Sequence, residues 1–112
     1  MTVAIDFDGT IMRGPDFDYA ECSMWVKIAR AFQNHDHRVI IVTMRPHGLR
    51  RNHTMPYAER MKVEVVFCGG FPDKRTALRE FGVSVDLWID DMPDTIGSLP
   101  LISIADPEAD SG

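Results

Sequence analysis

Apolar runs alternate with amphipathic stretches along the 112 residues of the chain. This alternation predicts a parallel sheet with helices packed on its faces. Mainly apolar runs that indicate strands cover residues 3–5, 39–42, 63–68, 87–89 and 99–104, and the β-branched run at 39–42 is too continuous to be half exposed. We therefore expect a single doubly wound α/β domain over residues 1–105, with a five-stranded, mainly parallel sheet flanked by helices, and an acidic tail at 106–112.

The first predicted helix begins after Asp18, which is a candidate N-cap with Glu21 three residues further on, the spacing of a capping box. Behind this cap, apolar residues recur at the i, i+3, i+4, i+7 spacing of one helix face: Trp25, Ile28, Ala29 and Phe32. The pattern predicts an amphipathic helix that covers the sheet.

A second helix is predicted after the candidate cap Asp73, with one face formed by Ala77, Leu78 and Phe81 and with Gly82 as its stop. Residues 44–62 are ambiguous, because Pro46 and Pro56 bracket a polar, basic stretch that suits either a short helix or a loop.

Composition is that of a globular protein, with 45% hydrophobic and 26% charged residues. No apolar run approaches the roughly 18 residues that a membrane-spanning helix needs, so we expect a soluble, cytoplasmic protein without a membrane partner. Cys22 and Cys68 lie in apolar segments, which favours buried thiols over a disulfide.

The net charge of −5 argues against general nucleic-acid binding, but the charges are unevenly distributed. Five basic residues and one acid lie between Arg45 and Lys62, whereas eight acids and no Lys or Arg follow from Glu80 onward. Two interpretations stay open. The surface is simply polarised and solvated, or the basic stretch faces an anionic substrate while the acids surround a metal ion.

Polar residues that could take part in chemistry follow the predicted strands. Asp6, Asp8, Thr43, Asp90 and Asp91 stand at strand ends, and Lys74 opens the helix after the third strand. The carboxyl ends of parallel strands share one edge of a sheet, so these residues are expected to converge. Four carboxylates in one place repel each other unless a cation lies among them, and hard oxygen ligands favour Mg²⁺.

Four motifs carry a family resemblance: DFDGT at 6–10, VIIVTMR at 39–45, PDKR at 72–75 and LWIDD at 87–91. In this order they resemble the signatures of the haloacid dehalogenase superfamily of phosphohydrolases, and the resemblance spans residues 3–91. It implies a Rossmann-like fold and a magnesium-dependent phosphatase.

The resemblance also implies roles for individual residues. Asp6 is the nucleophile that forms an aspartyl-phosphate, and Asp8 is the general acid and base. Thr43 resembles the hydroxyl donor of the second motif, and Lys74 the cation of the third motif, although Lys62 is a less favourably placed rival. Gly9 permits the tight turn that brings backbone N–H groups to the phosphate.

The resemblance further implies three metal ligands: the Asp6 carboxylate, the backbone carbonyl of Asp8 and an acid of the fourth motif. We favour Asp91 as the direct ligand and Asp90 as its supporting partner, whether Asp90 reaches the metal itself or through water. Arg45, which follows Thr43 in the basic stretch, is a candidate substrate-binding residue.

No segment between the motifs is long enough for the cap module that this family usually carries, so we expect a capless member with an open site. We favour a nucleotidase-like activity on a phosphorylated small molecule. A phosphatase of polynucleotide ends or of phosphoproteins is an alternative, and a homo-oligomer in which a second subunit acts as the lid is another. A non-catalytic domain that binds metal and phosphate for regulation is the competing class.

Overall fold

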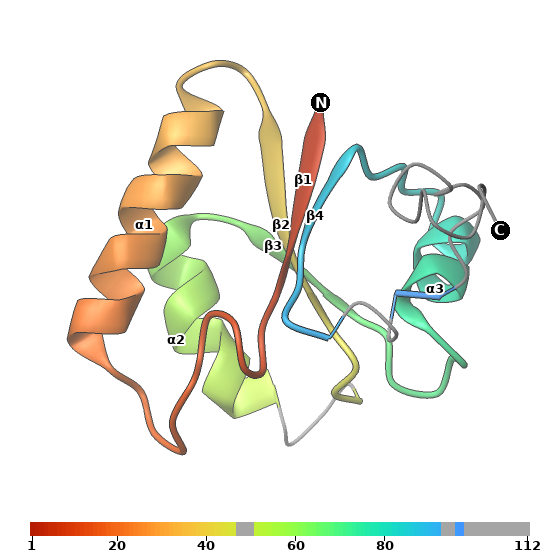
Figure 1. Ribbon diagram of the computed structural model, residues 1–112, viewed down its shortest axis with the longest axis horizontal. Helices are drawn as coiled ribbons and strands as arrows, with labels where there is room; N and C mark the ends of the chain where they lie inside the picture. The colour runs from red at the N-terminus through yellow and green to blue at the C-terminus, as the bar shows by residue number, and fades with distance from the viewer. Residues whose placement is uncertain (47–50, 93–95, 98–112) are drawn as a thin grey trace, which may run out of the picture.

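The computed structural model describes residues 1–46, 51–92 and 96–97 and contains a parallel sheet with helices on both faces (Figure 1). The strands are β1 (Thr2–Asp6), β2 (Arg38–Thr43), β3 (Glu64–Phe67) and β4 (Leu87–Ile89). The helices are α1 (Tyr19–Gln33), α2 (Arg51–Met61) and α3 (Lys74–Glu80). The predicted α/β class is confirmed.

The strand predictions hold for four of the five apolar runs. Each of these runs forms a strand, and all three strand pairs are parallel. Within the described residues the sheet therefore has four strands, not the five predicted. The fifth run at 99–104 lies outside the described residues, as does the predicted tail at 106–112.

Strand alternation sorts the apolar side chains into two cores. Val3, Ile5 and Ile41 belong to the cluster that packs against α1 and α2. Ala4 and Ile40 face the opposite side, in a cluster that includes residues of α3. Because both faces are covered, both odd and even positions of β1 and β2 are apolar, which explains the continuous runs in the sequence.

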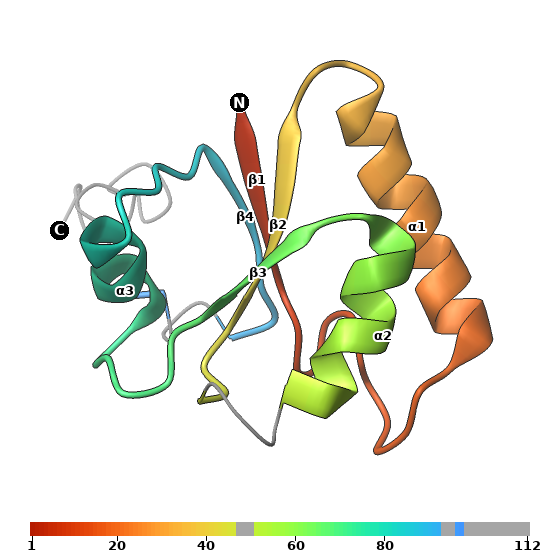
Figure 2. The same ribbon diagram turned by 180° about the vertical axis from the view of Figure 1, so that it is seen from behind.

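The sheet order β3-β2-β1-β4 contains a reversal of direction. From β1 the chain passes through α1 and α2 out to β3, and then it returns through α3 to place β4 beside β1. Figures 1 and 2 show α1 and α2 on one face and α3 on the other. The reversal puts a topological switch point at the carboxyl ends of β1 and β4, where open α/β sheets bind their ligands.

Both predicted helix caps are present. The Asp18 carboxylate accepts the Glu21 N–H at 2.9 Å, and the Asp73 carboxylate accepts the Thr76 N–H at 2.7 Å. One position of the second helix was predicted wrongly. Phe81 is the C-cap residue and is 54% exposed, because α3 ends before the face predicted for it is complete.

The sequence left residues 44–62 ambiguous between a helix and a loop. Arg51–Met61 of this segment form helix α2, although Pro56 lies inside it. Its buried face is formed by residues with an i, i+3, i+4, i+7 spacing: Thr54, Tyr57, Ala58 and Met61. Two of these positions carry a threonine and an alanine, so the helical pattern was weak in the sequence.

The described part of the chain has no helix with the length and apolarity to cross a membrane. Cys22 and Cys68 are both buried and both carry free thiols, as predicted.

The buried hydroxyl of Tyr57 connects α2 to the start of α1. It accepts a hydrogen bond from the Asp18 N–H at 3.1 Å and donates one to Glu21 Oε1 at 3.2 Å. The Glu21 carboxylate also accepts the Arg13 N–H, at 3.2 and 3.3 Å from its two oxygens. The predicted capping box is therefore only half formed, since the Glu21 side chain turns to Tyr57 and Arg13. These bonds anchor the loop between β1 and α1, which carries Asp8.

Replacing Tyr57 by Phe should lower the free energy of unfolding by about 0.5–1.5 kcal/mol, because the part-buried hydrogen bonds of its hydroxyl with the Asp18 N–H and the Glu21 carboxylate are lost. Urea unfolding measures this change. The matched control is Tyr19→Phe, since Tyr19 is 69% exposed and should change stability by less than about 0.5 kcal/mol. Equal losses in the two variants would contradict the role assigned to the Tyr57 hydroxyl.

Candidate functional site

A buried ammonium group joins two carboxylates at the carboxyl edge of the sheet. Lys74 Nζ donates to Asp6 Oδ1 at 2.8 Å and to Asp90 Oδ2 at 2.5 Å. The exposed fractions of these side chains are 2% for Lys74, 7% for Asp6 and 2% for Asp90. The sequence prediction that Lys74 reaches the acidic residues is confirmed, and its rival Lys62 is exposed at the end of α2.

Strand alternation explains why these three groups meet. Asp6 follows Ala4 by two positions and so points to the face that α3 covers. Asp90 follows Trp88 in the same way, and Trp88 also packs in the cluster on the α3 side. Lys74 opens α3, so its side chain reaches the carboxylates from that face. Burial alone would lower the pKa of Lys74, but the hydrogen bonds with Asp6 and Asp90 raise it, so the ammonium stays charged at neutral pH.

Asp91 alternates to the other side and meets the loop after β1. Thr10 Oγ1 lies 3.2 Å from Asp6 Oδ2 and 3.2 Å from Asp91 Oδ1, and it accepts the Asp91 N–H at 3.2 Å. Thr10 therefore connects the two carboxylates, although its single hydroxyl proton serves one of them at a time. Thr10 stands four residues after Asp6 in the DFDGT motif, which is the sequence signal for this contact.

The carboxylates of Asp6, Asp90 and Asp91 form a group that could hold a metal ion, since one oxygen from each lies within 4.8 Å of the others. Burial raises the pKa of Asp6 to about 6, although Lys74 opposes the shift. The neighbouring Asp6 carboxyl lowers the pKa of Asp91. A divalent cation among these carboxylates would relieve their mutual repulsion.

The chemistry of this donor set suits a hard divalent cation. Three carboxylates and one ammonium leave two negative charges when all four groups are ionised, and carboxylate oxygens are the preferred ligands of Mg²⁺ and Ca²⁺. Asp91 is the most accessible of the three acids, whereas the Asp90 carboxylate is occupied by Lys74 and by the Met92 N–H at 2.8 Å.

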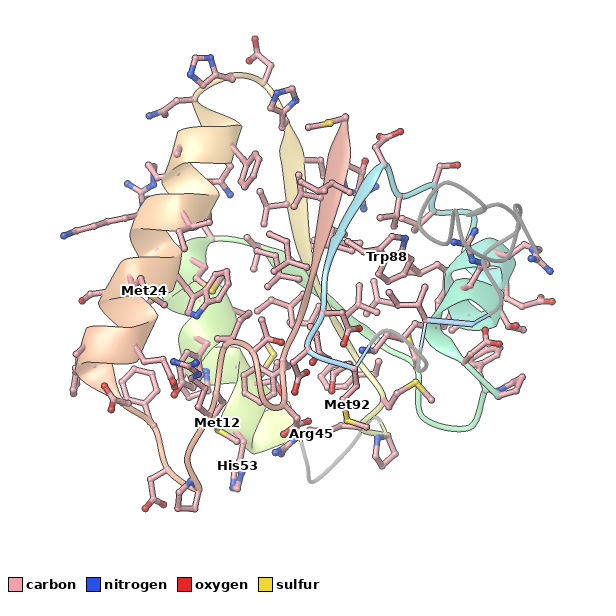
Figure 3. All side chains as sticks on the ribbon, in the orientation of Figure 1. Met12, Met24, Arg45, His53, Trp88 and Met92 are labelled. Atoms are coloured by element: carbon pink, nitrogen blue, oxygen red, sulfur yellow. The ribbon has the colours of Figure 1, made fainter. Side chains whose placement is uncertain are left out.

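Asp8 lies apart from this group, contrary to the expectation that four carboxylates meet in one place. Its carboxylate forms a two-pronged ion pair with Arg45, with Nε–Oδ2 at 2.8 Å and Nη2–Oδ1 at 2.5 Å. Arg45, predicted to bind substrate, therefore binds Asp8 in this structure. Figure 3 shows Arg45 at the same edge of the sheet as Met92, which follows the Asp90-Asp91 pair.

Gly9 forms the expected tight turn, with φ of +85°, but its own N–H donates to Met12 O at 2.9 Å and is not directed at a ligand. Glycine is required here for a second reason: an added Cβ would lie 2.9 Å from the Asp91 carboxyl carbon. The turn and the acid pair can approach each other only because residue 9 has no side chain.

Thr43 ends β2 on the strand next to β1, one residue beyond the position that pairs with Asp6. Its side chain is fully buried, and its Oγ1 accepts the Arg45 N–H at 3.1 Å. Because that bond uses a lone pair of the oxygen, the Thr43 hydroxyl proton is left to donate.

A hollow of about 360 Å³ adjoins the acidic group and separates the loop after β1 from α1. It is lined by Thr10 and Asp91 on the site side and by Met24 and Trp25 of α1 on the other. Its volume falls in the range of small-molecule sites, roughly 300–1,000 Å³.

Comparison with protein-family models found no match, and no curated protein matched the chain. Among solved structures, a hypothetical protein from Xanthomonas campestris is similar, with a TM-score of 0.56 and 20% sequence identity. The likeness covers 86% of this chain and 60% of that protein, so the chain spans less than two thirds of its neighbour's length. At this identity the comparison shows the fold alone: a small α/β domain with a parallel sheet flanked by helices.

Proposed function

We propose that this chain is a magnesium-dependent phosphomonoester hydrolase of the haloacid dehalogenase type, in which Asp6 accepts the phosphoryl group. The observation that carries the proposal is the buried Asp6 carboxylate at the switch point, held by Lys74 Nζ at 2.8 Å and grouped with Asp90 and Asp91. A fixed carboxylate beside a cation and a set of metal ligands is what nucleophilic attack on a phosphate dianion requires.

Asp6 and Asp91 are the residues that would hold Mg²⁺ directly, together with the Asp8 backbone carbonyl that the resemblance implies. Asp90 would support them, because Lys74 and the Met92 N–H already occupy its carboxylate. Bound Mg²⁺ would orient the phosphate and offset the negative charge that develops on it.

We assign the remaining roles as the resemblance implies them. The Asp6 carboxylate attacks phosphorus, while Lys74 and the Thr43 hydroxyl bind the phosphoryl oxygens. Asp8 takes up a proton from solvent when Arg45 releases one of its carboxylate oxygens, gives that proton to the leaving oxygen, and then removes one from the water that hydrolyses the aspartyl-phosphate. Every step is assigned to a residue at the carboxyl edge of the sheet.

The substrate we favour is a phosphorylated small molecule, with nucleoside monophosphates the first to test. In the described part of the chain, only residues 7–18 separate β1 from α1 and only residues 68–73 separate β3 from α3, so neither connection holds a folded cap. An open edge also admits the phosphorylated end of a polynucleotide or a phosphoprotein, and a second copy of the chain could cover it.

Mg²⁺ should raise the melting temperature in a saturable way, because the cation binds the folded acidic group and relieves its repulsion. Asp91→Ala should abolish this shift, as measured by differential scanning calorimetry. Asp16→Ala is the control, since Asp16 is an exposed acid in the loop before α1. A shift that survives in Asp91→Ala would place the metal elsewhere.

Asp6→Asn should reduce Mg²⁺-dependent phosphate release to background, because a carboxamide cannot attack phosphorus, while its oxygen can still accept the hydrogen bond from Lys74. A phosphate-release screen across nucleotides, sugar phosphates and phosphorylated DNA ends measures this. Undiminished hydrolysis in Asp6→Asn would refute the mechanism. Mg²⁺ binding by the wild-type protein without turnover on any of these substrates would instead favour a non-catalytic binding domain.

Asp8→Asn should lower the rate on nucleoside monophosphates by about 10²- to 10⁴-fold, the usual contribution of a general acid or base. The loss should be smaller for p-nitrophenyl phosphate, whose leaving group needs little protonation. Equal losses on the two substrates would argue against proton transfer by Asp8.

A further inference from the structure

The pair formed by Arg45 and Asp8 is the charged contact at this edge that the roles above leave unexplained. Both guanidinium nitrogens that face Asp8 bind its carboxylate, at 2.8 and 2.5 Å. The Arg45 side chain is 15% exposed, and its guanidinium carbon lies 5.3 Å from the centroid of the Phe7 ring. Two-pronged geometry and stacking on a buried ring distinguish this contact from an ordinary surface ion pair.

The backbone beneath Arg45 is also fixed. The Arg45 N–H donates to Thr43 Oγ1 at 3.1 Å, and the Arg45 carbonyl accepts the Gly69 N–H at 3.3 Å. A Cβ added at Gly69 would lie 2.6 Å from the Pro46 nitrogen and 2.9 Å from the Arg45 carbonyl carbon, so only glycine allows the two turns to pack this closely. The guanidinium is therefore presented from a rigid base formed by the ends of β2 and β3.

Without such a partner, a fourth carboxylate would stand two residues from Asp6 with nothing to direct it. Turned towards Asp6, Asp90 and Asp91, it would add negative charge and offer a further cation ligand. Turned elsewhere, it would have no defined orientation towards a leaving group.

We propose that Arg45 is a positioning residue for Asp8, which keeps the Asp8 carboxylate out of the metal-binding group and fixes its orientation at the open edge. The ion pair between the two side chains is the observation behind this inference. The effect that we expect on catalysis rests on the proposed phosphatase activity. The effect that we expect on cation affinity can be measured without turnover.

A double-mutant cycle on cation affinity tests the first part. Arg45→Met keeps an unbranched side chain but removes the charge and both hydrogen bonds. We expect it to tighten Mn²⁺ binding, followed by electron paramagnetic resonance, by roughly 3- to 10-fold, a coupling usual for residues in contact. In the Asp8→Asn background the same substitution should have little effect, because the carboxylate that it releases is gone.

Arg13→Met is the control for charge alone, since Arg13 is an exposed cation that lines the hollow beside Asp91. Its effect on Mn²⁺ affinity should be the same in the wild-type protein and in the Asp8→Asn background. An equal effect of Arg45→Met in the two backgrounds would show that Arg45 acts only through its own charge and would overturn the proposal. Arg45→Lys, which can retain one of the two hydrogen bonds, should tighten Mn²⁺ binding less than Arg45→Met does.

Leaving-group dependence tests the catalytic part. Across aryl phosphates of increasing leaving-group pKa, Arg45→Met should steepen the decline of kcat/KM, as Asp8→Asn does, and it should add little to Asp8→Asn. A uniform loss on all substrates would indicate a structural role and contradict the proposal. If the wild-type protein hydrolyses no phosphomonoester, the proposed function fails, while the Mn²⁺ cycle still decides the role of Arg45.

Discussion

The buried ion triad of Lys74 with Asp6 and Asp90 is the interaction on which the rest of the site depends. It joins the first residue of α3 to the ends of β1 and β4, and thus connects three elements across the switch point of the sheet. Removal of one partner from a buried ion pair typically costs about 3–5 kcal/mol, because an uncompensated charge remains. Two carboxylates and one ammonium leave one net negative charge, and this excess charge is a basis of the proposed cation site.

The carboxylates divide into two sets with different environments. Asp6, Asp90 and Asp91 are held together by Lys74 and Thr10, whereas Asp8 is held apart by Arg45. Acids only a few residues apart can perform different tasks when their partners differ in this way. The separation supports one set for binding a cation and attacking phosphorus, and one residue for moving protons at the leaving group.

Much of the fold could be predicted because it depends on local patterns. Continuous apolar runs indicated β1 and β2, which are buried on both faces, and the side chains of Asp18 and Asp73 marked two helix starts. Helix α2 could not be predicted, since Pro56 opposes a helix locally, whereas the burial of Tyr57 and its neighbours depends on tertiary packing.

The candidate site, like the fold, could be predicted in part from the sequence. The convergence of Asp6, Lys74, Asp90 and Asp91 follows from parallel strands that end at one edge. Asp90 directly follows β4 and keeps the side on which Trp88 packs, which explains why it faces Lys74. The pairing of Asp8 with Arg45 was not predictable, because both lie beyond the ends of their strands, where turn geometry rather than alternation sets the direction of a side chain.

The central claim is that Asp6 carries the phosphoryl group, and chemical trapping of the intermediate tests it most directly. Borohydride added during turnover reduces an aspartyl-phosphate to homoserine, which mass spectrometry locates within the peptide that contains DFDGT. The account predicts homoserine at position 6 only when both substrate and Mg²⁺ are present. Sustained phosphate release with residue 6 recovered solely as aspartate, or with homoserine at another position, would contradict it.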